Sequence, residues 1–175
     1  MITNKEDYER YLSSLTNIAE TAPSVFRMKR LPVDETIYQI DLNTRKVSAP
    51  PFIGVTGDHS AEFIFFEMDR YYDMMDLSET IGLILFTNAN NEQYCQLIPC
   101  YDIYSVSGKI IFPWAVQVPA ALYTGQVSFA FKFFKIDPTS SKLLFELNTL
   151  VAKTKVLNGY ANITDSRKEY QVLNL

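Results

Sequence analysis

The sequence predicts a mainly β protein, organised as an antiparallel β-sandwich. Runs of alternating apolar and polar residues recur at a spacing of roughly 8 to 12 residues, with turn-forming residues between them, which is typical of sandwiches. The chain has 11 Tyr and 12 Phe among 175 residues, and aromatic side chains favour strands. Its length is that of one domain with a full hydrophobic core.

The stretch from residue 108 to residue 136 is predicted to form the centre of this fold. It contains the only tryptophan, Trp114. Its second half, from Gly125 to Ile136, carries one uniformly apolar face: Val127, Phe129, Phe131 and Phe133. This period of two indicates a long strand whose aromatic face lies in the core.

One amphipathic α-helix is expected over residues 4–22. Asn4 is a suitable N-cap, and Pro23 ends the helix. An apolar stripe repeats along it at helical spacing: Tyr8, Leu12, Leu15, Ala19 and Ala22. The stripe has two interpretations, since it either lies on its own domain or packs against copies of itself or a neighbouring subunit.

An extended arm is expected to follow, because residues 23–36 lose all periodicity and contain two prolines. The predicted domain organisation is therefore a helix and arm over residues 1–33, a β-sandwich over residues 34–159 and a tail over residues 160–175. The predicted strands cover residues 36–41, 45–48, 59–68, 80–87, 92–99, 101–106, 109–114, 125–136 and 142–157. Such a set is compatible with an immunoglobulin-like or a jelly-roll-like sandwich.

The bulk charge argues against nucleic-acid binding, since the formal net charge is -4 and the pI is about 5.0. The nearest approach to a basic patch is read as solvated loop charges: Lys29, Arg30, Arg45 and Lys46. No apolar run is long enough to predict a membrane span, and the polar N-terminus does not resemble a signal peptide. We therefore expect a reducing compartment, in which Cys95 and Cys100 stay unbridged.

The sequence predicts no catalytic, cofactor-binding or metal-binding site. The only histidine, His59, lies between Asp58 and Ser60. These are the residue types of a catalytic triad, but neighbours in a strand point to opposite faces and a triad must converge from separate segments. His59 is therefore expected to be a turn residue, and the protein is expected not to be an enzyme.

The densest acidic cluster occupies one segment of the chain: Glu67, Asp69, Asp73 and Asp76. Such carboxylates could hold Ca²⁺ or serve a hydrolase. The spacing of a calcium loop is absent, however, and Arg70 is at hand to neutralise one carboxylate. The favoured interpretation is a polar capped turn, with neighbouring apolar side chains partly packed beneath it: Tyr71, Tyr72, Met74 and Met75.

Residues 34–159 resemble a domain that recurs in structural proteins of tailed phages and prophages of Gram-positive bacteria. The resemblance is carried by the segments DETIYQIDLNTRKVSAPPFIGVTGDHSAEFIFFEMDRYYDMMDL, KIIFPWAVQ, GQVSFAFKFFKID and FELNTLVAKTKVLNG. From Ala61 to Val156 the chain is also similar to the N-terminal domain of siphophage upper baseplate proteins, including a D-L-S-x-T step at Asp76 to Thr80. In that family the domain is an immunoglobulin-like sandwich that attaches to the particle.

The resemblance implies a non-enzymatic virion protein, assembled in the host cytoplasm, whose partners are other virion proteins. We expect a homo-oligomer, for example a trimer, that docks as a tail or baseplate component or adaptor. The expected contact residues lie in the N-terminal helix and arm: Tyr8, Leu12, Leu15 and Phe26. Because the chain adds this helix and arm and has no receptor-binding module after Leu157, a capsid decoration protein or a head-fibre base is the alternative.

A second class of function is a carbohydrate-binding module that would bind a host glycan. It would use exposed tyrosines as stacking platforms. The candidates are Tyr71, Tyr72, Tyr101 and Tyr104.

Overall fold

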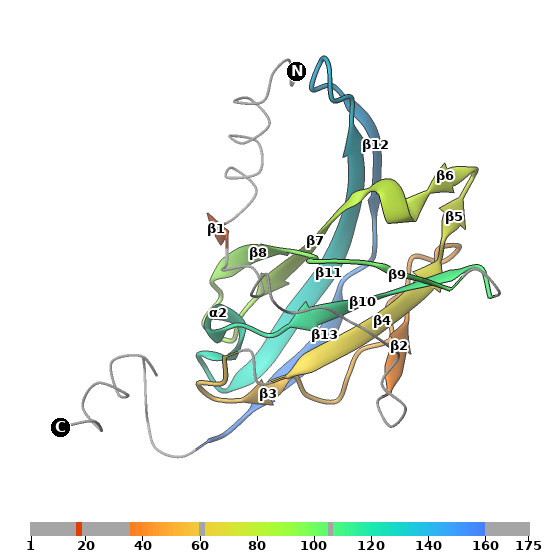
Figure 1. Cartoon of the computed structure of the whole chain (residues 1–175). Helices are drawn as coiled ribbons and strands as arrows, with labels where there is room; N and C mark the ends of the chain where they lie inside the picture. The colour runs from red at the N-terminus through yellow and green to blue at the C-terminus, as the bar shows by residue number, and fades with distance from the viewer. Residues whose placement is uncertain (1–16, 19–35, 60–61, 105–106, 160–175) are drawn as a thin grey trace.

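Strand β11 (Gly125–Ile136) lies at the centre of the larger of two sheets in the computed structural model, which describes residues 17–18, 36–59, 62–104 and 107–159 (Figure 1). All twelve residues of the predicted central strand form this element. Its strand neighbours in this larger sheet run in the order β1-β8-β7-β11-β13-β3, with β12 paired to the second half of β11. Their bounds are β1 Asn17–Ile18, β8 Gln93–Leu97, β7 Ile81–Thr87, β13 Ala152–Leu157, β3 Gly54–Val55 and β12 Leu143–Asn148.

The smaller sheet has the order β2-β4-β10-β9. Its strands are β2 Ile37–Gln39, β4 Phe63–Asp69, β10 Lys109–Ala115 and β9 Asp102–Tyr104. Pro113 lies within β10 although proline has no N–H for a ladder. The sheet accommodates it because β9 pairs with β10 only as far as Ile111, so that Pro113 has a strand partner on one side only.

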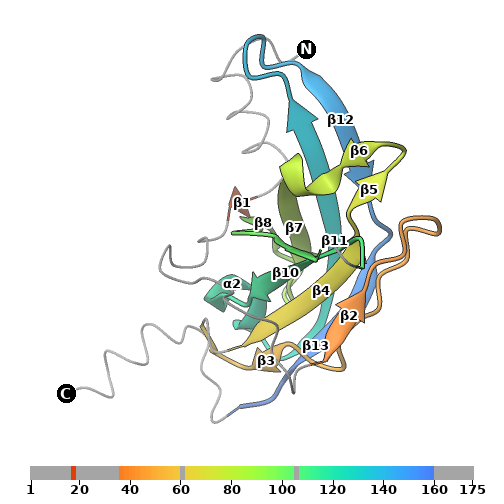
Figure 2. The same cartoon turned by 45° about the vertical axis from the view of Figure 1, so that its right-hand side comes forward.

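Three short elements complete the described fold. β5 (Tyr71–Tyr72) and β6 (Met75–Asp76) form a two-stranded ribbon, which a 3-10 turn, Leu77–Glu79, connects to β7. A single turn of helix, α2 (Val118–Ala121), follows β10. Figures 1 and 2 show the ribbon beyond the end of β4, and Tyr72 and Met75 of the ribbon pack against the core.

The two sheets face each other across an aromatic core. Phe131 of β11 lies with its ring centroid 4.8 Å from that of Phe66 in β4 and 5.3 Å from that of Phe112 in β10. Trp114 of β10 packs at 5.3 Å from Phe129 of β11. The two contacts of Phe131 are edge-to-face and that of Trp114 is tilted, and together they join the sheets at their middle. The predicted apolar face of β11 is fully buried there, which confirms the interpretation of its alternating pattern.

Two expectations about the sheets are wrong in detail. The sandwich was expected to be antiparallel, but β1 pairs with β8, β3 with β13 and β2 with β4 in parallel. These are pairings of short strands at sheet edges, whereas the long central strands pair antiparallel. The single strand expected over residues 142–157 is broken by Thr149 to Val151 into β12 and β13.

The helix expected over residues 4–22 does not run through Asn17 and Ile18, which form β1 instead. They pair with Tyr94 and Cys95 of β8. Asparagine and β-branched isoleucine are weak helix formers, and the free edge of β8 offers them backbone hydrogen bonds. The rest of the expected helix, and residues 160–175, lie outside the described residues.

The outer face of the larger sheet, turned away from the smaller sheet, is buried at one end and open at the other. Leu83, Lys132 and Phe134 lie on this face and are buried. Leu85 and Ala130 lie further along the same strands, Val151 lies just before β13, and all three retain solvent exposure. The open end is therefore a sheet surface that is accessible to other molecules. Among the described residues no helix is long and apolar enough to cross a membrane.

Candidate interaction surfaces

The tip of the β5–β6 ribbon presents apolar side chains to solvent. Met74 is 95% exposed and Tyr71 is 54% exposed. The two turn residues, Asp73 and Met74, have φ values of 46° and 69°. This left-handed region is costly for residues other than glycine, asparagine and aspartate, so Met74 is held in a strained backbone conformation. The ribbon therefore keeps a large apolar side chain in water at an energetic cost.

A pair of hydrogen-bonded charges locks the base of the ribbon. The Arg70 guanidinium donates from Nε to Asp76 Oδ1 at 3.1 Å and from Nη2 to Asp76 Oδ2 at 2.8 Å. The same carboxylate accepts from the backbone N–H and the hydroxyl of Ser78. Arg70, followed by Ser78, lowers the pKa of Asp76 to about 2, against its partial desolvation. Two-pronged pairing of this kind fixes orientation as well as distance.

A second arginine holds the ribbon from the side. Arg45 Nη2 donates to the Tyr72 hydroxyl at 3.0 Å, and the guanidinium lies 5.1 Å from the centre of that ring. Arg45 Nη1 also donates to the backbone carbonyl of Asn148 at 2.9 Å. Arg45 thus ties the ribbon to the end of β12. It is not the solvated loop charge that the sequence predicted.

The acidic cluster does not converge on a metal or on a reaction centre. Asp69 pairs with Lys109 at 2.6 Å, and Asp76 pairs with Arg70. Asp73 stands apart at the exposed tip. Among the described residues no three histidine, cysteine or acidic side chains are placed to bind a metal ion together. The interpretation as a polar capped turn is confirmed, since Asp76 caps the 3-10 turn through Ser78. Tyr71 and Met74, however, are exposed rather than packed beneath it.

Acid titration of Asp76 gives a measurable prediction. Its pKa is lower in the folded chain than in the unfolded chain, so its stabilisation is complete above the unfolded value of about 4 and is lost as the pH falls through about 2. After allowance for screening at this partly exposed site, we expect about 1–2 kcal/mol of the free energy of unfolding to depend on it. Urea unfolding at pH 7 and pH 2.5 should show this loss for the wild type.

Asp76→Asn should lower stability at pH 7 and lose less on acidification. Asp73→Asn is the matched control, because it removes the same charge on the same ribbon from a residue that forms no ion pair within the described part of the chain. An unchanged acid response in Asp76→Asn would show that the Arg70 pair does not stabilise the fold.

Asp58 and His59, the two described residues of the triad-like motif, do not act on a common site. His59 Nδ1 accepts a hydrogen bond from the backbone N–H of Val118 at 3.1 Å, at the start of α2. The Asp58 carboxylate accepts instead from the backbone N–H of Val55 at 3.0 Å. His59 and Asp58 therefore serve backbone groups in two different places, and Ser60 lies outside the described residues.

Neither Cys95 nor Cys100 is in a disulfide, as the sequence predicts. Cys95 is buried in β8, and burial raises the pKa of its thiol. A protonated buried thiol is a weak nucleophile. Cys95 is therefore a packing residue of the sheet edge.

The four candidate tyrosines do not form one stacking platform. Tyr101 packs edge-to-face on Phe112, and burial of its hydroxyl raises its pKa. The Arg70 guanidinium lies 5.2 Å from the ring centre of Tyr71, and Arg45 lies over Tyr72. Tyr104 is half-buried in β9. Tyr71 is the one member of the set that is largely exposed.

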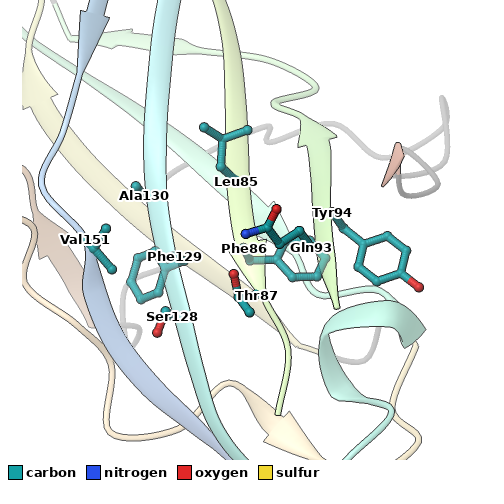
Figure 3. A pocket seen from close by; sticks show the side chains of 9 residues that line it. All are labelled: Leu85, Phe86, Thr87, Gln93, Tyr94, Ser128, Phe129, Ala130 and Val151. Carbon is teal, nitrogen blue, oxygen red and sulfur yellow. The ribbon is translucent and has the colours of Figure 1, made fainter. Parts of the chain in front are cut away.

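A shallow apolar groove on the outer face of the larger sheet is the second candidate surface (Figure 3). Its volume is about 320 Å³. Leu85 of β7, Ala130 of β11 and Val151 just before β13 form an apolar row across it, because Leu85 pairs with Ala130, and Val151 directly precedes the partner of Phe129. A polar row runs beside it, in which Thr87 pairs with Ser128 and Ser128 with Lys153. Directly opposed residues share one face of a sheet.

Sequence reasoning did not find this groove, because its members come from segments that are separated in the sequence and none is unusual by itself. The expected contact residues, Tyr8, Leu12, Leu15 and Phe26, all lie outside the described residues. The weak signal that was available is the pair Leu150-Val151, two apolar residues between β12 and β13 with exposed fractions of 53% and 66%. The ribbon tip was noticed as a turn, but its exposure was missed.

The fold and these two surfaces define a mainly β scaffold that presents apolar contact sites, with its charged candidate residues engaged in holding loops together. Comparison with known proteins adds no identity, since no known family and no curated protein matches the chain.

Proposed function

We propose that the chain is a non-enzymatic structural protein of a phage virion, a sandwich of immunoglobulin-like or jelly-roll-like type that docks on the particle through its N-terminal segment. Its place is a tail or baseplate component or adaptor, and the alternative is a capsid decoration protein or head-fibre base. The sequence resemblance of residues 34–159 to such proteins motivates this role. Its partners are other virion proteins.

The pairing of β1 with β8 is the observation that supports docking through the N-terminal segment. Asn17 and Ile18 extend the larger sheet at its edge. The N-terminal segment is thus joined to the edge of the sheet at these two residues. Backbone hydrogen bonds of this kind hold an added strand to a sheet edge.

The test is incorporation into particles. In a phage or prophage whose own copy of the gene is interrupted, chain supplied in trans should enter particles when it is wild type. The double variant Leu12→Asp plus Leu15→Asp should enter at least about tenfold less, because two charges in an apolar contact exclude burial. The readout is the amount of chain in purified particles.

Ser13→Asp plus Ser14→Asp is the matched control, since it adds the same charge beside the expected stripe. This control should incorporate normally. Equal incorporation of both double variants would overturn the role of the stripe, and absence of the wild-type chain from particles would overturn the virion role itself.

A further inference from the structure

Two exposed apolar surfaces lie on different parts of the same molecule. The ribbon tip projects beyond β4, whereas the groove lies on the outer face of β7 and β11 (Figures 1 and 3). Because the tip and the groove of one molecule lie on different parts of it, a contact between a tip and a groove joins two molecules. Such a contact is heterologous, and it leaves one tip and one groove free at the two ends of every assembly that does not close into a ring.

The shapes of the two surfaces match. Met74 is unbranched and flexible, which suits it to an irregular shallow hollow. It stands at the tip of a ribbon whose base is locked by the pairing of Arg70 with Asp76. On the outer face the groove is lined by the apolar side chains of Leu85, Ala130 and Val151, with polar side chains beside them, and its volume of about 320 Å³ has room for a methionine side chain. A rigid support for the inserted side chain lowers the entropy that binding would cost.

The charges of the two surfaces match as well. Asp73 precedes Met74 and is exposed, and Lys153 is exposed at the end of the polar row beside the groove. Neither side chain forms an ion pair within the described part of the chain. Two residues along a strand span roughly 7 Å, so the polar row lies within reach of Asp73 when Met74 lies on the apolar row.

We propose that the ribbon tip of one copy binds the outer-face groove of a second copy, with Met74 on the apolar row of Leu85, Ala130 and Val151 and with Asp73 facing Lys153. The partner is this chain itself. Repetition of the contact builds a ring when the rotation between copies closes, and a chain of copies when it does not. The backbone strain at Met74 is then the cost of presenting the side chain to the next copy.

The first experiment measures the mass of the full chain by light scattering, up to concentrations of about 1 mM, which suits small and weak interfaces. The wild type should associate as concentration rises. Met74→Gly should weaken association at least about tenfold, the effect expected for a central contact residue. Because glycine adopts positive φ without strain, this variant should melt no lower than the wild type, so unfolding does not account for the loss.

Mixing two variants then tests the heterologous geometry. Met74→Gly keeps an intact groove, and Ala130→Glu keeps an intact tip but puts a charge in the apolar row. Each alone should stay monomeric, and the mixture should form a complex of one copy of each and nothing larger. Leu144→Ser, at an exposed apolar residue of β12, is the control and should associate as the wild type does.

Reversal of the charges tests the orientation. Asp73→Lys should weaken association, and Asp73→Lys combined with Lys153→Asp should restore it. A wild type that remains monomeric throughout, or a mixture of the two variants that forms no complex, would overturn the proposal.

This contact does not depend on the virion role, and its failure is distinguishable from failure of that role. Leu12→Asp plus Leu15→Asp should reduce incorporation into particles and leave association through the ribbon tip intact. Association that is lost in that variant but kept in Met74→Gly would place the contact between copies in the N-terminal segment, and would overturn the proposal for the ribbon.

Discussion

Phe131→Ala is expected to lower the free energy of unfolding by about 3–5 kcal/mol, the range for removing a large aromatic side chain from a packed core. The ring of Phe131 is fully buried and lies against Phe66 and Phe112 of the opposite sheet. It also contacts the rings of its strand neighbours Phe129 and Phe133. Its removal therefore leaves a cavity where the two sheets meet, and the surrounding rings can refill only part of it.

Urea unfolding followed by tryptophan fluorescence is the measurement, since Trp114 lies in the same core and is the only tryptophan. Phe131→Leu should cost clearly less, because leucine keeps most of the volume. Leu144→Ala, at an exposed apolar residue, should change stability by no more than about 0.5 kcal/mol. A loss below about 1 kcal/mol for Phe131→Ala would mean that the two sheets do not pack through this ring.

The burial of Phe131 illustrates what the sequence can predict in this fold. The alternation from Val127 to Phe133 identified the core face of β11. Every second side chain of a strand lies on the same face, so a buried face appears as an apolar residue at every second position. The same pattern left Phe134 and Lys132 on the solvent side. Both are nevertheless buried. Burial of the second face of a sheet depends on which distant segments pack against it. The sequence of the strand alone does not predict those segments.

Short strands at the sheet edges were also predicted poorly from the sequence. The stripe from Tyr8 to Ala22 satisfies a helical period, yet Asn17 and Ile18 pair with β8. A helix of that length gains only fractions of a kcal/mol per residue from propensity, whereas an unpaired sheet edge offers hydrogen bonds to any extended segment. The hydrophobic period of the local sequence is enough to predict the long central strands. Whether a short segment forms a strand depends instead on whether a distant sheet edge is available to pair with it.

The candidate surfaces depend on contacts between distant residues in the same way. Arg45 was read as a solvated charge because the partners that tie it to the ribbon and to β12 are distant in the sequence. It binds Tyr72 and Asn148, which are 27 and 103 residues away. The exposure of Met74 follows from the left-handed turn at residues 73 and 74. The sequence Asp73-Met74 does not predict such a turn, because it lacks the glycine that usually marks one.

Gly82→Ala is expected to destabilise the protein by about 1–3 kcal/mol through overpacking. Gly82 is the second residue of β7, and a glycine within a strand costs stability unless close packing requires it. A methyl group at this position would lie 2.4 Å from Ile98 Cδ1 and 2.5 Å from the Tyr101 hydroxyl oxygen. The glycine thus creates the space in which Tyr101 is buried, and this burial is what removes Tyr101 from an exposed tyrosine platform.

Thermal and urea unfolding of four proteins tests this directly: the wild type, Gly82→Ala, Tyr101→Phe and the double variant. The Tyr101 hydroxyl is buried beside Thr80 without the geometry of a hydrogen bond. Tyr101→Phe alone should therefore be close to neutral, since it removes a buried polar group that lacks a partner. In the double variant it should recover part of the loss, because the clash with the oxygen is gone and only the flexible end of Ile98 must move.

Gly108→Ala is the comparison that separates packing from backbone strain. Gly108 has a φ of +68° and open space around its Cα, so its substitution should cost stability through backbone conformation alone. Tyr101→Phe should give no recovery in that background. Equal recovery in both backgrounds, or none in Gly82→Ala, would show that Tyr101 does not depend on the space at Gly82, and would return its hydroxyl to the set of groups available for binding a ligand.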